Sequence, residues 1–234
     1  KTFIPRPAYL KRIEPFIGKP VIKVLVGQRR VGKSVLLQEI RESLRGRGIG
    51  EDALISVNME QHEFAEIRTD SDLVSYVEGR RKKDGQSYLF VDEIQEIRDF
   101  EKALRSLLSE GHVDIFCTGS NARILSGDLA TFLGGRYVEI RVHALSFPEF
   151  LEFHRLEASP SSLETYAHFG GLPFLVHLPF EEQPVGDYLG SVYGAILFRD
   201  VVSRHGIRNV AFLERLAAYL ADNTGSMVSA KRIS

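Results

Sequence analysis

The sequence has little of what stabilises small extracellular folds or builds metal sites. Its 234 residues include one cysteine and no tryptophan, and its seven histidines show no paired ligand spacing. A single cysteine cannot form an internal disulfide, and a structural zinc site needs closely spaced cysteine and histidine ligands. The sequence therefore argues against both. We expect Cys117, within the apolar run 113–117, to be a buried and unreactive thiol.

Long apolar runs and an excess of one charge are also missing. No apolar stretch approaches the ~18 residues that cross a bilayer, and residues 1–7 lack the apolar core of a secretory signal. Thirty lysines and arginines stand against 31 aspartates and glutamates, so no chain-wide basic field indicates nucleic acid. We expect a cytoplasmic protein in a reducing compartment, without a membrane, with one sizeable core and a smaller appendage.

Short strand-like runs alternate with helical patterns through the first part of the chain. The predicted strands cover 21–26, 53–57, 88–91, 113–118 and 137–142. The predicted helices between them cover about 33–45, the segment around 73–77, and 100–108. Asp70 and Ser71 are expected to cap the second of these helices. Strict alternation of strand and helix predicts an α/β fold, with a parallel sheet covered by helices on both faces.

The pattern after residue 145 is helical only. Helical stretches fit 147–154, 161–169, 185–204 and 209–222, and the segment 170–173 interrupts them. We place domain boundaries near residues 158 and 207. This divides the chain into a core of 1–158, a helical segment of 159–207 and a C-terminal segment of 208–234.

A complete phosphate-binding loop signature, GQRRVGKS, follows the first predicted strand and opens the first long helix. Its glycines let backbone N–H groups turn around phosphate oxygens, and the helix N-terminus adds a partial positive charge. We expect Lys33 to reach the terminal phosphates and the hydroxyl of Ser34 to bind Mg²⁺. The nucleotide-binding candidates here are Gly27, Gln28, Arg29, Arg30, Val31, Gly32, Lys33, Ser34 and Val35.

Two acids, Asp92 and Glu93, end the predicted strand 88–91. Asp92 is expected to hold Mg²⁺ together with Ser34, and Glu93 to orient an attacking water. Acids at a strand end also occur in solvated turns, but the phosphate-binding loop earlier in the same sheet favours the catalytic interpretation. Adjacent aspartate and glutamate favour hydrolysis of the γ-phosphate over its transfer to a small molecule.

Further polar residues follow the next predicted strand. Thr118, Ser120 or Asn121 could sense the γ-phosphate or position water, and ordinary helix capping is the alternative for Ser120 and Asn121. The glycine spacing around Ser120 does not fit a nucleophile elbow. Arg136, just before the fifth predicted strand, could stabilise transition-state charge in cis or from a neighbouring subunit, with a surface arginine as the alternative.

Taken together, these motifs resemble the prokaryotic AAA-type ATPases of the archaeal-ATPase branch, which are related to the signalling ATPases with numerous domains. The matching segments cover almost the whole chain: 27–34, 90–95, 118–121, 133–137, 145–150 and 170–173. The resemblance implies a P-loop NTPase with a five-stranded parallel sheet of order 5-1-4-3-2, followed by a helical lid over 159–207. Gln28 and Ala144 replace prolines that are frequent in such proteins, and neither touches the catalytic groups.

The resemblance also implies where ATP binds. ATP would lie at the carboxyl edge of the sheet, with Gly171 and Pro173 approaching it from the lid. The segment 6–10, which contains Tyr9, resembles the N-terminal strip that covers adenine in these proteins. A simple amphipathic helix is the alternative for this segment.

The sequence thus predicts a slow, regulated ATPase that depends on ATP and Mg²⁺. Lys33 and Ser34 bind phosphate and metal, Asp92 supports the metal, Glu93 orients water, and Asn121 or Thr118 senses the γ-phosphate. The same residues would serve a nucleotide-operated switch, in which hydrolysis only resets the protein. A small-molecule kinase is less favoured because the chain has no evident acceptor-site motif. A homo-oligomer would let Arg136 act on a neighbour.

The C-terminal segment has the pattern of two helices around a turn. Residues 209–222 form an amphipathic pattern that 223–225 interrupts, and Ser229 would cap a second helix from Ala230. Helix, turn and helix open the winged-helix domains fused to related ATPases, so we expect a truncated, winged-helix-like segment with DNA as a candidate partner. Two short helices packing on the lid are the alternative. Lys231 and Arg232 alone supply little charge for phosphate contacts.

Overall fold

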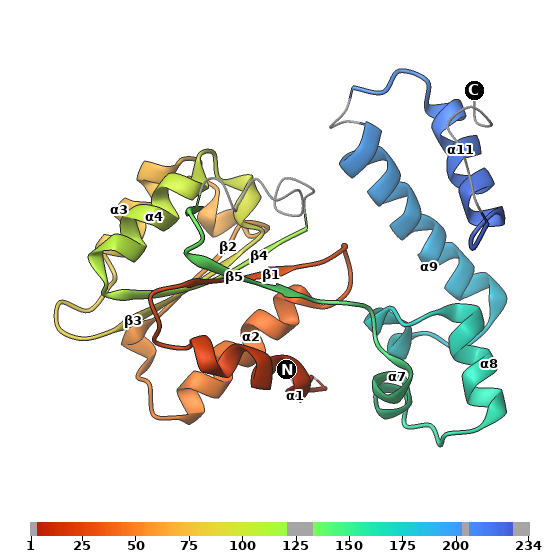
Figure 1. Cartoon of the computed structure of the whole chain (residues 1–234), viewed down its shortest axis with the longest axis horizontal. Helices are drawn as coiled ribbons and strands as arrows, with labels where there is room; N and C mark the ends of the chain where they lie inside the picture. The colour runs from red at the N-terminus through yellow and green to blue at the C-terminus, as the bar shows by residue number, and fades with distance from the viewer. Residues whose placement is uncertain (1–3, 121–132, 203–205, 227–234) are drawn as a thin grey trace. The chain divides into compact units, whose positions relative to one another are not determined.

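The computed structural model describes residues 4–120, 133–202 and 206–226, and Figure 1 shows the course of the chain. The chain divides into two compact units, Lys1–Val185 and Gly186–Ser234. Helix α9 (Glu182–Ala195) begins in the first unit and continues into the second, which also contains the π-helix η6 (Ile196–Val202) and α11 (Val210–Asp222). The domain boundaries expected near residues 158 and 207 stay predictions.

A five-stranded parallel sheet forms the centre of the first unit. Its strands are β1 (Ile22–Val26), β2 (Leu54–Asn58), β3 (Ser87–Asp92), β4 (Val113–Gly119) and β5 (Tyr137–Arg141). They lie in the order β2-β3-β4-β1-β5, which confirms the predicted fold class and strand order. Val26, at the end of β1, pairs with Gly119 of β4 and Arg141 of β5, so the carboxyl ends of these strands meet at one edge.

Helices cover both faces of this sheet. Figure 1 shows α3 (Asp70–Glu78) and α4 (Phe100–Glu110) on one face, and α1 (Pro7–Ile13) and α2 (Lys33–Gly46) on the other. Every residue of β1 and β4 is buried, as expected for parallel strands between two helical layers. Further along the unit follow α7 (Phe147–His154) and α8 (Pro160–Phe169). Short 3-10 helices complete it: η1 (Glu14–Phe16), η2 (Glu51–Ala53), η3 (His62–Phe64), η4 (Ile94–Glu96) and η5 (Pro173–His177).

Two local predictions were wrong. Thr69, and not Asp70 or Ser71, caps α3: its hydroxyl accepts from the amide of Asp72, whose carboxylate accepts in return from the amide of Thr69. This capping box satisfies two amides that the first helical turn leaves unpaired, which Asp70, already inside the helix, cannot do. The single helix expected over 185–204 is instead α9, which ends at residue 195, followed by the π-helix 196–202. Three β-branched residues in that stretch have low α-helical propensity.

An ion pair is buried between the two central strands. Lys23 of β1 donates to Oδ1 of Asp114 on β4, and their side chains are 0% and 1% exposed. The amide of Gly18 donates to Oδ2 of Asp114 at 2.8 Å, and the ammonium group lies 4.4 Å from the ring centre of Phe116. Burial lowers the pKa of Lys23 and raises the pKa of Asp114, and each charge partly offsets the shift of the other. Each charge therefore offsets part of the free-energy cost of burying the other.

Removing one partner of this pair should destabilise the protein strongly. We expect Lys23→Met to lower the free energy of unfolding by about 3–5 kcal/mol, because it leaves a buried carboxylate without its cation. The double variant Lys23→Met/Asp114→Asn should recover most of this loss, since asparagine removes the charge and still accepts from Gly18. Urea unfolding followed by circular dichroism measures both. A double variant no more stable than the single one would contradict this assignment.

Candidate functional site

The strand order brings the candidate motifs together at the carboxyl edge of the sheet. β4 lies between β3 and β1, so the acids that end β3 and the loop that follows β1 flank the end of β4. Thr118 and Ser120 lie at that end, and Leu25 is the partner of Thr118 in the register. The three motifs expected to carry the chemistry therefore meet at one place.

The loop after β1 leads directly into α2 without a side-chain cap. Gly32 is the N-cap residue, with a φ of 93°, and no side chain bonds to the first amides of the helix. Such an N-terminus favours an anion, because its amides and the helix dipole both present positive charge. The side chain of Lys33 is buried, and its Nζ donates to the carbonyl of Gln28 across the loop at 2.9 Å. The expectation that Gln28 does not touch the catalytic groups was therefore wrong, because its backbone carbonyl contacts Lys33. Gln28, Arg30 and Val35 are exposed, while Arg29 and Ser34 are half-buried.

A close backbone contact fixes where the loop begins. The amide of Val142, just after β5, donates to the carbonyl of Val26 at 2.7 Å. A Cβ atom on Gly27 would overlap the carbonyl oxygen of Val142, and the φ of Gly27 is 154°. Only glycine fits at this position, so the first glycine of the motif serves the approach of β1 to the segment after β5.

A buried hydroxyl holds the two acids. Thr118 donates to Oδ1 of Asp92 at 2.5 Å and accepts from the backbone amide of Glu93 at 2.9 Å. Asp92 and Glu93 are 5% and 8% exposed, and Glu93 has a φ of 56°, in the left-handed region. The only hydroxyl proton of Thr118 therefore goes to Asp92 in this arrangement. The geometry favours a role for Thr118 in placing the acids over direct sensing of a phosphate.

The carboxylate of Glu93 is itself engaged by protein donors. Ser120 Oγ donates to Oε2 of Glu93 at 2.8 Å, and Nε2 of Gln95 donates to the same oxygen. Ser120 was among the polar candidates from the sequence, whereas Gln95 was not singled out and lies only within the matching segment 90–95. Its spacing of two residues from Glu93 is the signal that could have identified it. Asn121, the other predicted sensor, lies outside the described residues.

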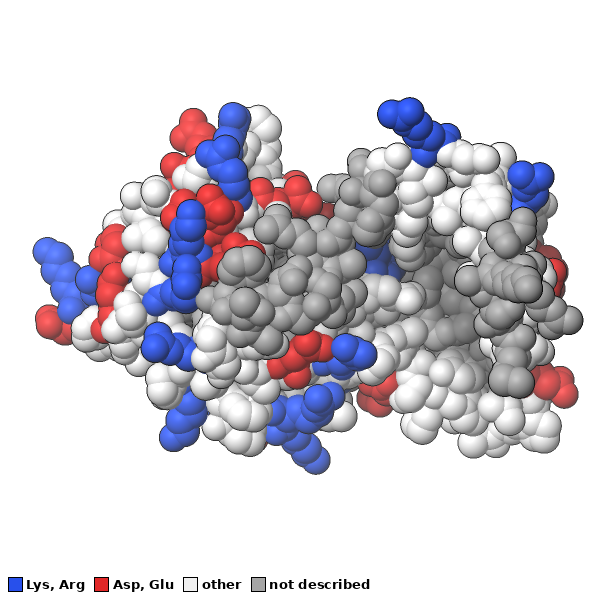
Figure 2. All heavy atoms as spheres, turned by 45° about the horizontal axis from the view of Figure 1, so that its top comes forward, with Lys and Arg blue, Asp and Glu red and all other residues white. Residues whose placement is uncertain are grey.

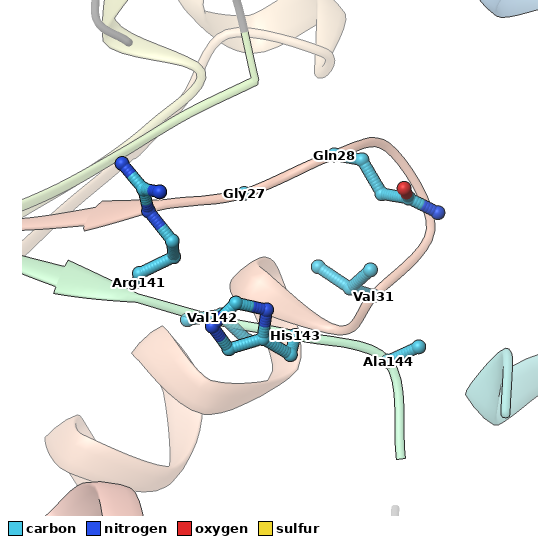
Figure 3. Close-up of a pocket in the computed structure, with 7 residues that line it drawn as sticks. All are labelled: Gly27, Gln28, Val31, Arg141, Val142, His143 and Ala144. Atoms are coloured by element: carbon cyan, nitrogen blue, oxygen red, sulfur yellow. The ribbon is translucent and has the colours of Figure 1, made fainter. Parts of the chain in front are cut away.

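A pocket lies between the loop and the segment that follows β5. Figure 3 shows its walls, one from the end of β1 and the loop and the other from the end of β5. Its volume is about 400 Å³, within the range of pockets that bind small ligands. The residues that line it are Gly27, Gln28, Val31, Arg141, Val142, His143 and Ala144.

The N-terminal strip contacts one wall of this pocket. Residues 7–13 form α1, and Tyr9 within it is buried. The hydroxyl of Tyr9 accepts from the amide of His143 at 3.0 Å, and its ring centre lies 4.6 Å from the guanidinium carbon of Arg6. The structure thus brings Tyr9 to the segment after β5. Contact of this strip with a base stays a prediction.

Gly171 and Pro173, which we call the glycine–proline motif, lie close to the phosphate-binding loop. The amide of Leu145 donates to the carbonyl of Gly171 at 2.7 Å, and a Cβ on Gly171 would overlap the carbonyl oxygen of Leu145. That same oxygen also accepts from the hydroxyl of Tyr166 at 2.8 Å. Cγ of Pro173 lies 3.8 Å from the position of a Cβ on Gly32. Pro173 therefore lies beside the phosphate-binding loop.

Arg136 lies away from the other candidates. It is exposed, and its carbonyl accepts from the amide of Ile22 at 3.0 Å, at the start of β1. This is the amino edge of the parallel sheet, and a strand the length of β5 separates it from the carboxyl edge by roughly 16 Å. The structure does not bring Arg136 to the site of its own chain. The role in cis does not suit this position, whereas action on a neighbouring subunit and a surface arginine without a catalytic role both stay predictions.

Comparison with known proteins identifies the family. The sequence model of the AAA domain family matches residues 19–151, more than half of the chain. An uncharacterized protein of Haemophilus influenzae is 33% identical over 240 residues, which cover 100% of this chain and 59% of that protein. An uncharacterized protein of Methanocaldococcus jannaschii is 30% identical over 225 residues, covering 91% and 49%. The chain thus spans between 49% and 59% of the length of these relatives.

Solved structures share the fold at low sequence identity. Hsp104 with ATPγS and FITC-casein gives a TM-score of 0.52 at 16% identity, covering 86% of this chain and 40% of that chain. The complex of S. cerevisiae Hsp104 with casein gives 0.50 at 14%, covering 85% and 39%. The chain belongs to the AAA domain family, whose members are nucleotide-binding ATPases with a P-loop. Among the residues that the structure describes, no helix has both the length and the apolar character needed to cross a membrane.

The contact between Gly171 and Leu145 can be tested by adding one methyl group. Gly171→Ala should lower the free energy of unfolding by about 1–3 kcal/mol, because its Cβ meets a backbone oxygen that cannot move aside. Gly190→Ala is the matched control: this glycine lies within α9 with open space around its Cβ, so alanine should leave stability unchanged or raise it slightly. Thermal unfolding of both variants measures the difference. Equal stability of the two variants would contradict the proposed contact.

Proposed function

We propose that this protein binds ATP with Mg²⁺ and hydrolyses it to ADP and phosphate. The observation that carries the proposal is the hydroxyl of Thr118, which joins Asp92 and Glu93 at the sheet edge where the phosphate-binding loop begins. A buried pair of acids held in fixed orientation beside such a loop is the arrangement that nucleotide hydrolysis requires. A sheet edge without function would gain nothing from burying two carboxylates.

Each group then has a defined role. The uncapped start of α2 and Lys33 bind the phosphates, because amides and ammonium both neutralise their charge. The hydroxyl of Ser34 and the carboxylate of Asp92 are the hard oxygen ligands that Mg²⁺ prefers, and the metal would offset charge on the β- and γ-phosphates. Glu93 orients the attacking water and accepts its proton. The hydroxyl of Thr118 holds the two acids in position relative to each other.

The base would occupy the pocket beside the loop. Its volume suits a heterocycle, and its wall residue Val31 continues directly from the phosphate-binding segment. The strip around Tyr9 contacts the opposite wall through His143. Pro173 beside Gly32 supports an approach of the glycine–proline motif to the nucleotide. The motifs after residue 133 favour the archaeal-ATPase branch within the family.

A slow nucleotide-operated switch is the second candidate. It is favoured by the state of Glu93, whose Oε2 already accepts from Ser120 and Gln95. Both donors hold the carboxylate in one orientation, so a water has to reach its other oxygen, Oε1, or displace a donor before Glu93 can accept a proton.

Binding of DNA through the C-terminal segment has less support. Helix α11 is present as expected, but the second helix expected from Ala230 lies outside the described residues. On the side of the sheet, Figure 2 shows basic side chains next to acidic ones, and among the described residues it shows no basic cluster around the second unit. DNA phosphates favour a surface of one sign, which such a mixture does not provide. A winged-helix-like segment that binds DNA stays a proposal from the sequence.

Replacing Glu93 tests the proposed hydrolysis directly. We expect Glu93→Gln to lower kcat for release of phosphate from ATP by about 100-fold or more, because glutamine cannot accept the proton of the attacking water. Binding of ATP should persist. Glu96→Gln is the matched control, since Glu96 is an exposed acid on η4 just beyond Glu93. A Glu93→Gln protein as fast as wild type would contradict the role of Glu93.

The same assay, run over a range of protein concentrations, separates the two candidates. Turnover per chain that rises with concentration supports an oligomeric ATPase in which Arg136 acts in trans. Turnover that is independent of concentration and below about one per minute supports the switch, since typical enzymes turn over near 10 per second.

A further inference from the structure

Arg6 is a buried arginine whose whole guanidinium is engaged. Its side chain is 6% exposed, although arginine is seldom buried without partners. Nη1 donates to the carbonyl of Val31 at 3.2 Å and to that of His143 at 3.0 Å. Nε and Nη2 donate to the two carboxylate oxygens of Glu149 at 2.8 and 3.1 Å. One planar group thus joins three segments that are far apart in the sequence.

The two carbonyls belong to opposite walls of the pocket. Val31 lies in the phosphate-binding loop, and His143 lies in the segment after β5. Both hydrogen bonds come from the same nitrogen, Nη1. The two carbonyl oxygens must therefore both stay within hydrogen-bond distance of this atom, which limits the distance between the walls. Displacing either wall would leave a buried charged donor without an acceptor, which is costly.

The carboxylate belongs to the first turn of α7. Glu149 accepts from the amide and the hydroxyl of Ser146 at 2.9 and 2.7 Å, which completes the capping box of that helix. Burial opposes the charged form, but the hydrogen bonds from Arg6 and Ser146 outweigh it and lower the pKa of Glu149. The ion pair therefore persists at neutral pH and holds the start of α7.

The backbone at Arg6 is fixed as well. Its amide donates to both carboxylate oxygens of Glu39 on α2, at 3.1 and 3.2 Å. The arginine is therefore anchored on the helix that the phosphate-binding loop opens. The guanidinium is thus held at both ends, by this backbone anchor and by its own bonds to Val31, His143 and Glu149.

We propose that Arg6 is a positioning residue for nucleotide binding, which sets the spacing of the pocket walls and ties it to α7. The inference rests on the proposed function, because it assumes that the pocket and loop bind nucleotide. Arg6 touches the carbonyls of two wall residues and acts on the nucleotide through them. A displacement of the loop is therefore transmitted through Arg6 to α7, and a displacement of α7 is transmitted to the loop.

Equilibrium binding of Mg-ATP and of ADP tests this. We expect Arg6→Gln and Arg6→Lys to weaken both by roughly ten-fold, while kcat at saturating ATP changes little. Lysine keeps the charge for Glu149 but lacks the fork that also reaches two carbonyls, so it should not rescue binding. Glu149→Gln, which leaves the carbonyl contacts of Arg6 in place, should weaken binding less. Arg47→Gln, which removes an arginine of an exposed pair at the end of α2, is the matched control.

Hydrogen exchange gives a second test, in which each protein is compared with itself in the presence and absence of Mg-ATP. In wild type, Mg-ATP should slow exchange at the amides of loop 28–32 and also in the first turn of α7, and Arg6→Lys should abolish only the effect on α7. Arg6 variants that bind nucleotide as wild type does, or a wild type whose α7 does not respond, would overturn the inference and leave the proposed function intact. A wild type that binds no nucleotide would overturn both.

Discussion

The approach of Gly27 to the carbonyl of Val142 is the constraint on which the site depends. It brings the end of β1 against the segment after β5 so closely that no side chain fits between them. The loop therefore leaves the sheet from a fixed point and leads into the uncapped start of α2. Because all strands are parallel, the acids that end β3 meet the loop at the same edge. The strand order thus brings together the groups that we propose to bind phosphate, metal and water.

A series of contacts around the pocket starts at the phosphate-binding loop and returns to it. Arg6 joins the loop to the segment after β5 and to the cap of α7. The residue before that cap, Leu145, bonds to Gly171, and two residues later Pro173 lies against Gly32 of the loop. The series begins and ends at the phosphate-binding loop, so its helices are linked to the loop from two sides. This linkage is how a small ligand at the loop can act on helices further along the chain.

The sequence was sufficient for what is encoded in short, local patterns. Alternating runs predicted the parallel sheet, and the spacing of glycines, Lys33 and Asp92 predicted the loop and the acids. The order of the strands came from the resemblance to a known family. What it could not supply were contacts between distant segments. Nothing in the local pattern around Arg6 shows that its side chain reaches Val31 and Glu149, because those partners are 25 and 143 residues away. The cap of α3 was missed for a different reason, since neighbouring Thr69 and Asp70 are both good capping residues and only geometry decides between them.

The central claim, that this edge of the sheet binds Mg-ATP, is tested most directly by ligand-dependent stability. We expect millimolar Mg-ATP to raise the Tm of the wild-type protein by several degrees, because a ligand at 100 times its Kd adds about 2.7 kcal/mol to the free energy of unfolding. Lys33→Ala should lose this shift, since it removes the ammonium group that reaches the terminal phosphates. A wild-type Tm that Mg-ATP leaves unchanged, or a Lys33→Ala protein stabilised as much as wild type, would contradict the account.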